Sequence, residues 1–238
     1  MHRPNADADS REAGTSAGRW GEAGEGGGPG DRRPGTTMWA VFAEAVKFPD
    51  AQRCDDICSG RFVEDLRSAL GQWDPFVLTA VDWDALAKAG RADALPVDYT
   101  SLFDGGAGGR CPLNGGPLHR VPMAAMEEVV RFYAHFGMTL AEDAPETPDH
   151  LSVELEFVAC LAYGEADLEA RGESGMHYAR ARRDFIARHP LRTVSHACRQ
   201  LADVSAAPFY GALLTLLDRC LRTDLDRLEA VHGTATIG

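Results

Sequence analysis

Apolar residues recur along this chain at intervals of three and four, which is the spacing of a helix with one buried face. Each such stripe ends near a proline or a glycine, the residues that stop helices. The first half of the chain has four predicted helices of this kind: Trp39, Phe42, Ala43 and Val46 before Phe48-Pro49; Phe62, Leu66, Ala69 and Leu70 before Gly71; residues 81–90, closed by Gly90; and Met126, Val129, Val130 and Tyr133 before Gly137.

The second half continues the helical pattern. The strongest prediction is a helix with Thr147 as N-cap and Pro148 in the first helical position, running to about Tyr163. Residues 175–189 follow, stopped by His189-Pro190, and then residues 191–203. A last helix is capped by Ser205 and has one apolar side: Phe209, Leu213, Leu216, Leu217, Cys220 and Leu221. No stretch alternates with period two for long enough to predict a strand.

These patterns predict an all-α fold, a single helical bundle domain of about eight to ten helices. Residues 37–232 would form this domain. Residues 1–36 are rich in Gly, Ala and charged side chains, a composition that buries too little apolar area to offset the entropy of ordering. We therefore expect a disordered tail over 1–36 and a short C-terminal tail over 233–238.

Composition narrows the function classes. The formal net charge is -12, and an acidic surface repels phosphate, so nucleic acid is not an expected partner. The charge suits a basic ligand or peptide, or serves only to keep the protein soluble. No apolar run reaches the roughly 18 residues that a membrane-spanning helix needs.

The cysteines and the start of the chain point to the cytoplasm. Six cysteines occur without a CxxC pair, which is neither a zinc framework nor a secreted disulfide scaffold, so we expect reduced thiols. The first residues are polar and lack the apolar segment of a secretory signal. Arg32-Arg33 is a twin arginine, but Pro-Gly-Thr-Thr follows it and argues against an export signal.

One loop has an unusual composition. Residues 104–117 read DGGAGGRCPLNGGP, with six glycines in fourteen positions. The lysine and the preceding strand of a phosphate-binding P-loop are both missing. Two interpretations remain open: a flexible surface connection, or a loop that becomes ordered over a bound partner.

The segment Pro148–Phe157 carries the most information about function. It opens a helix that is apolar nearly all round, hence buried, yet it contains four ionisable residues: Asp149, His150, Glu154 and Glu156. Buried charges need partners. Helix capping with a buried polar network is one explanation. The other is a polar site at the mouth of the helix, in which Asp149 accepts hydrogen bonds from an arginine and His150 shapes the pocket.

An enzyme or a metal-binding protein is the main alternative. His150 and Glu154 are four residues apart and could share an ion, with Glu156 nearby. HExxH, GxSxG and any recognisable catalytic triad or dyad signature are missing, so these residues predict no metal site and give no support for a cofactor or an enzymatic activity.

The same segment resembles a known signature. Residues 146–157, ETPDHLSVELEF, follow the pattern E-x-P-D-H-[IL]-x-x-E-L-x-F of the TorD/DmsD/NarJ family of redox-enzyme maturation chaperones. Other segments resemble family elements in the same order: Trp39–Phe42 through Phe48-Pro49, Asp98–Phe103 before the Gly-rich loop, Phe132–Met138, and Pro208–Leu213. The Gly- and Cys-containing loop is most similar to chaperones of the type II dimethyl-sulfoxide-reductase group. One departure is that no tryptophan follows His189.

The resemblance implies a cytoplasmic chaperone that binds the twin-arginine leader, or the immature catalytic subunit, of a molybdoenzyme. It would hold this client until the molybdenum cofactor is inserted. Asp149 and His150 match the positions linked to leader binding, and Pro148 and Glu154 would support them. Tyr99, Leu102 and Phe103 would line a groove for the apolar part of the leader. A homodimer with exchanged helices is compatible with a bundle that has a long central loop.

Overall fold

The protein folds into a bundle of α-helices packed around one core. A computed structural model describes residues 36–79, 81–90, 94–104, 109–141, 144–203 and 208–235. Within these ranges the regular elements are eleven α-helices and one 3-10 helix, and the buried apolar side chains form one cluster. The all-α prediction is therefore confirmed. The predicted N-terminal tail, except Thr36, and residues 236–238 lie outside the described residues.

The helices follow one another with short connections. Their bounds are α1 Thr36–Ala45, α2 Ala51–Ser59, α3 Arg61–Trp73, α4 Pro75–Leu78, α5 Trp83–Ala89, α6 Leu95–Phe103, the 3-10 helix η3 Gly116–Leu118, α7 Pro122–His135, α8 Leu151–Ala170, α9 Met176–Arg188, α10 Pro190–Leu201 and α11 Pro208–His232. None of these described helices is long and apolar enough to cross a membrane.

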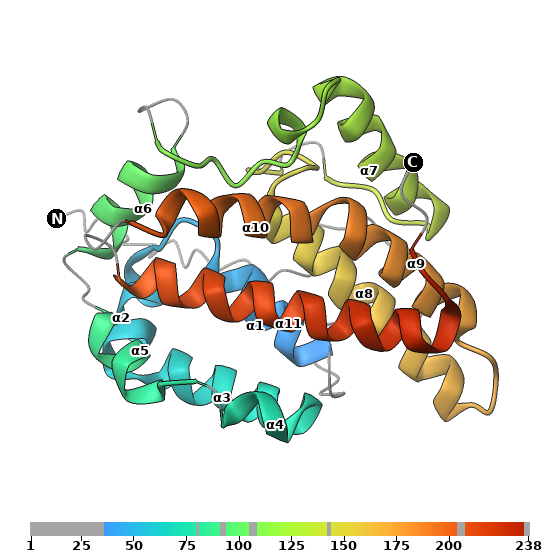
Figure 1. Cartoon of the computed structure of the whole chain (residues 1–238), viewed down its shortest axis with the longest axis horizontal. Coiled ribbons are helices and arrows are strands. Elements are labelled where there is room, and N and C mark those ends of the chain that lie inside the picture. The colour runs from blue at the N-terminus through green and yellow to red at the C-terminus, as the bar shows by residue number, and fades with distance from the viewer. Residues whose placement is uncertain are drawn as a thin grey trace, which may run out of the picture.

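Helix α8 is the central element. It packs against α1 on one side and α9 on the other, while α10 lies along α11 as a second pair (Figure 1). Every residue from Leu151 to Ala159 is buried. Because both stripes of this helix are apolar, no side of it is exposed to solvent over this length. The prediction of a buried central helix is confirmed.

The start of α8 differs from the prediction. The helix begins at Leu151, not after Thr147, and it ends at Ala170 rather than near Tyr163. Thr147 does not cap it: the Thr147 hydroxyl donates to Asp149 Oδ1 at 2.6 Å, and the cap is His150, whose Nδ1 accepts from Ser152 N. Contacts that Asp149 makes with a distant segment, described below, hold residues 147–150 outside the helix.

Other helix predictions agree with the structure to within a few residues, including the break between α9 and α10 at His189-Pro190. The proposed cap Ser205 lies outside the described residues. Helices α2, α4 and α6 were not predicted from periodicity. Helix α2 buries only Cys54 and Ile57, so its apolar stripe is too short to read from spacing.

Candidate functional site

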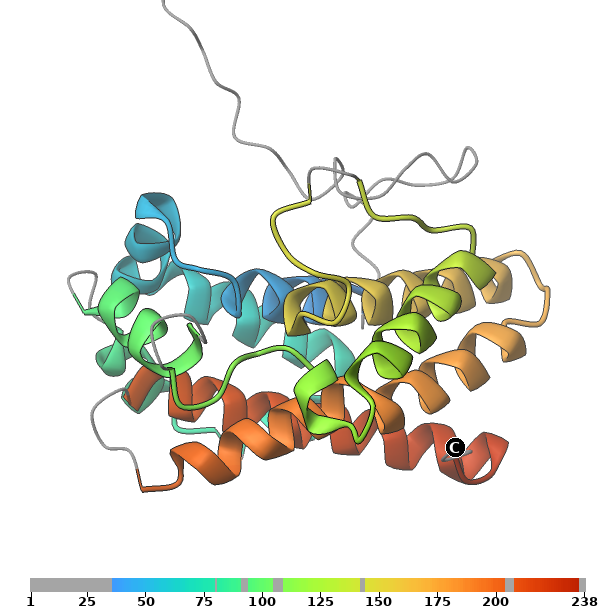
Figure 2. The same ribbon diagram turned by 90° about the horizontal axis from the view of Figure 1, so that it is seen from above.

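A mostly irregular segment that ends in the short 3-10 helix η3 closes over the beginning of α8. We call residues 109–118, between α6 and the end of η3, the strap. It runs alongside α10 (Figures 1 and 2). Three backbone hydrogen bonds attach it: Cys111 N donates to Leu102 O at 2.9 Å, Leu151 N to Leu113 O at 2.8 Å, and Gly115 N to Asp149 O at 2.9 Å. The second half of the predicted Gly-rich loop is thus a packed cover, while residues 105–108 lie outside the described residues.

Asp149 is the main side-chain attachment of the strap. Its carboxylate is 3 % exposed and accepts from three donors: Gly116 N at 2.9 Å, Thr147 Oγ1 at 2.6 Å and Asn114 Nδ2 at 3.4 Å. Tyr133 of α7 donates to Pro148 O at 2.8 Å and fixes the backbone beside it. The Asp149 carboxylate therefore already accepts three hydrogen bonds in this conformation, and it joins the strap to the mouth of α8.

His150 has a capping role at the same place. It is buried, and its Nδ1 lies 2.9 Å from Ser152 Oγ and 3.2 Å from Ser152 N. Its Nε2 lies 3.8 Å from a Glu146 carboxylate oxygen. Its backbone pairs with Asn114 of the strap in an isolated bridge. Asp149 and His150 thus lie together at the mouth of α8, against the strap, and their part in peptide binding stays a prediction.

Glu154 lies one turn further along α8. Its side chain is fully buried, and neither carboxyl oxygen has a hydrogen-bond partner among the described residues. Burial, and then the nearby Asp149 carboxylate, raise the pKa of Glu154 well above its ordinary value. The Thr193 hydroxyl of α10 is likewise buried without a partner in the described part of the chain. Glu154 is thus not satisfied by the network that holds Asp149.

Two glycines let the strap approach both carboxyls. A Cβ on Gly115 would lie 3.2 Å from Glu154 Oε1 and 3.2 Å from Thr193 Oγ1. A Cβ on Gly116 would lie 2.9 Å from Asp149 Oδ2. Asn114, Gly115, Gly116 and Thr193 were not among the predicted site residues. The adjacent glycines were the only local signal that a backbone must come close here.

Substitution of Gly116 by alanine is expected to loosen the strap. Because the new methyl group meets a carboxylate that is already held by hydrogen bonds, we expect a loss of about 1–3 kcal/mol in the free energy of unfolding. Faster hydrogen exchange at the amides of Gly116 and Leu151 would show that the strap is the part that moves. Gly211→Ala on α11 is the matched control, since nothing lies within 4 Å of its Cβ. Equal exchange in both variants would contradict this assignment.

The predicted groove residues have a different environment. Tyr99, Leu102 and Phe103 are all buried on α6. The Tyr99 hydroxyl donates to Val46 O at 3.1 Å, and its ring contacts Phe103 and Tyr210 at centroid distances of 5.0 and 5.8 Å. These three side chains fill the core in this conformation, and their role in peptide binding stays a prediction.

Two of the exposed apolar side chains lie on α7, the helix that follows the strap. Met123 is 64 % exposed and Val130 44 %. The two are seven residues apart, so they share one face of the helix. The strap reaches this helix at its start, where a Cβ on Gly116 would lie 3.6 Å from Pro122 O. An apolar surface thus adjoins the mouth of α8.

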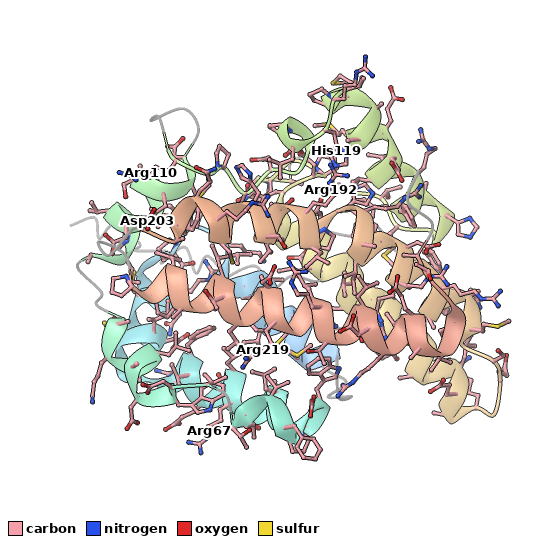
Figure 3. All side chains as sticks on the ribbon, in the orientation of Figure 1. Arg67, Arg110, His119, Arg192, Asp203 and Arg219 are labelled. Carbon is pink, nitrogen blue, oxygen red and sulfur yellow. The ribbon has the colours of Figure 1, made fainter. Side chains whose placement is uncertain are left out.

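The surface along α10 is basic. Residues 105–126 and 185–202 contain five arginines and no Asp or Glu. Arg192 lies beside the end of the strap, with Nη2 3.5 Å from Leu118 O, and His119 lies close to it (Figure 3). Burial, then Arg192, lower the pKa of His119. Burial, then His119, lower the pKa of His189 to about 3. The charge of the chain is therefore unevenly distributed.

The alternative metal site is not assembled in the structure. Glu156 points away from Glu154 and pairs at 2.9 Å with Lys47, two residues after the end of α1, while His150 caps α8. Among the described residues no three His, Cys, Asp or Glu side chains come together as metal ligands. All six cysteines are unpaired.

Comparisons with known proteins point to one protein family. Residues 60–199 match the family model described as "Nitrate reductase delta subunit". The chain is 31 % identical over 194 residues to the dimethyl sulfide dehydrogenase assembly chaperone protein of Rhodovulum sulfidophilum, covering 77 % of this chain and 76 % of that one. It is 33 % identical over 156 residues to the selenate reductase assembly chaperone protein of Thauera selenatis, covering 60 % and 79 %.

A more distant match is the chaperone protein TorD of Vibrio cholerae serotype O1, 26 % identical over 70 % of each chain. Among solved structures, a putative redox enzyme maturation protein from Archaeoglobus fulgidus matches with a TM-score of 0.46 and 18 % identity, covering 80 % of this chain and 93 % of that one.

Proposed function

Since the chain belongs to the TorD/NarJ family of redox-enzyme maturation chaperones, we propose that it is the cytoplasmic assembly chaperone of a molybdoenzyme catalytic subunit. It binds the twin-arginine leader or the immature subunit until the molybdenum cofactor has been inserted. The dimethyl sulfide dehydrogenase and selenate reductase chaperones among its relatives support a client of a related kind.

The arrangement of strap, carboxyls and apolar surface supports leader binding. A leader of this type offers two arginines followed by an apolar stretch. The mouth of α8 offers Asp149 beneath the strap, and Met123 and Val130 lie on the adjoining helix. Arginine recognises a carboxylate through charge-assisted, often bidentate hydrogen bonds. We propose that the apolar stretch lies on α7 instead of reaching the buried Tyr99, Leu102 and Phe103.

Calorimetry with a synthetic peptide tests this proposal. The peptide carries two consecutive arginines and a following apolar stretch, and its control has glutamines in place of both arginines. We expect saturable binding of the arginine peptide and an affinity for the glutamine peptide lower by about tenfold or more, because charged hydrogen bonds contribute roughly 1.5–3 kcal/mol each. No binding of the arginine peptide would refute leader recognition.

Two variants locate the apolar contact. The double variant Met123→Ser/Val130→Ser should weaken binding of the arginine peptide, since burial of apolar area contributes about 25 cal/mol per Å². Phe76→Ser is the matched control, because Phe76 is exposed on α4, away from the strap. Equal loss in both variants, or loss in the control alone, would remove α7 from the binding surface.

A further inference from the structure

Among the described residues, the Glu154 carboxyl is fully buried with neither oxygen hydrogen-bonded. Native structures pair nearly all buried polar groups, and the exceptions call for an explanation. Here two exceptions lie together: Glu154 and Thr193, from α8 and α10, are both unpartnered in the described residues and both face Gly115 of the strap. An unsatisfied carboxyl therefore lies directly beneath the strap.

Asp149 and Glu154 differ in their readiness to accept a ligand. Asp149 has three donors, so a guanidinium that reaches it must displace the strap amide Gly116 N or a neighbouring side chain. Glu154 has no donor to lose. The two carboxyls contact adjacent glycines of the strap. A guanidinium has five N–H donors in a planar fork and can reach two acceptor groups.

We propose that Glu154 is a buried acceptor for a client arginine, exposed when the strap lifts from the mouth of α8. This inference rests on the proposed leader-binding function. The strap is attached there through backbone bonds, Leu151 N to Leu113 O and Gly115 N to Asp149 O. An extended peptide can supply equivalent donors and acceptors, so it can take the place of the strap while its arginine enters below.

Binding of the arginine changes the protonation of Glu154. In the closed form burial raises the pKa of Glu154 well above its ordinary value and so favours the protonated carboxyl. A guanidinium favours the ionised carboxylate, so entry of the arginine forms the ion pair and releases the Glu154 proton to solvent. Because the complex then holds one proton fewer than the free partners, the affinity for the peptide rises with pH.

Few other titratable groups lie around Glu154 that could take up this proton. In the segment before α8 there is Asp149, and on α7 there is Tyr133, whose pKa is raised by burial. On the α10 side Thr193 does not titrate, and His189, one turn before it, has its pKa lowered to about 3. Glu156 pairs instead with Lys47, which follows α1.

The proton count on the full chain is the decisive measurement. Calorimetric titrations with the arginine peptide at pH 7, in phosphate and in Tris buffer, differ in heat by the ionisation enthalpy of the buffer for each proton released. We expect a net release of protons by the wild-type chain, up to one for each peptide bound. For Glu154→Gln we expect no release and an affinity lower by about 10- to 100-fold.

Glu64→Gln makes the same chemical change on the exposed face of α3. It should leave both the proton release and the affinity for the arginine peptide unaltered. Wild-type binding without proton release, or Glu154→Gln binding as tightly as the wild type, overturns the Glu154 inference and leaves leader binding standing. Failure of the wild-type chain to bind refutes leader binding itself. If Glu154→Gln does not fold, the wild-type proton count alone decides.

Discussion

Phe157→Ala is expected to lower the free energy of unfolding by about 3–5 kcal/mol, the range for removing a large aromatic side chain from a packed core. Phe157 is completely buried on α8. Its ring lies 4.8 Å from Tyr133, 4.7 Å from Phe185 and 5.9 Å from Phe136, measured between ring centroids. The substitution therefore removes the aromatic contacts through which α8 packs against α7 and α9.

Urea unfolding followed by circular dichroism measures this loss, and the slope with urea should stay unchanged if the folded state keeps its compactness. Phe76→Ala is the matched control, because Phe76 is 84 % exposed and its loss should cost no more than about 0.5 kcal/mol. A loss below about 1 kcal/mol for Phe157→Ala would mean that the aromatic cluster repacks freely. The cluster would then not fix the position of α8.

The position of Phe157 could be predicted from sequence, whereas the contacts of Asp149 could not. Both stripes of residues 151–162 are mostly apolar, and a helix with two apolar stripes has to be buried. The bonds from Asn114 and Gly116 to Asp149 join segments more than thirty residues apart, and no local spacing encodes such a pair. They also explain why the capping pattern at Thr147-Pro148 failed. A strong local signal was overridden by tertiary hydrogen bonds.

The buried state of Tyr99, Leu102 and Phe103 was within reach of sequence reasoning. Their spacing of three and four residues is that of a helical core stripe, and Pro96 near the start of α6 is a usual helix signal. The prediction of a groove came from the family resemblance and not from this spacing. In contrast, the unpaired state of Glu154 depends on the strap and α10 together, so only the three-dimensional arrangement reveals it.

A second large effect is expected for Lys47→Met, which removes the cation that faces Glu156. The Lys47 ammonium lies 2.9 Å from Glu156 Oε1 and also pairs with Glu44, and the Lys47 and Glu156 side chains are about nine-tenths buried. Removing one partner of a buried ion pair leaves the other charge uncompensated and costs roughly 3–5 kcal/mol. Because this pair joins the segment that follows α1 to the central helix α8, the loss should appear in the global unfolding transition.

The double variant Lys47→Met/Glu156→Leu separates charge from packing. Replacing both partners of a buried pair with apolar side chains is often neutral or stabilising, so the second substitution should recover most of the loss. Arg131→Met is the matched surface control, since Arg131 and Glu127 are mostly exposed at 3.9 Å and such a pair contributes no more than about 1 kcal/mol. If the double variant stays as unstable as Lys47→Met, the loss comes from packing of the lysine stem. In that case the ion pair is not what joins the segment after α1 to the helix that carries Glu154.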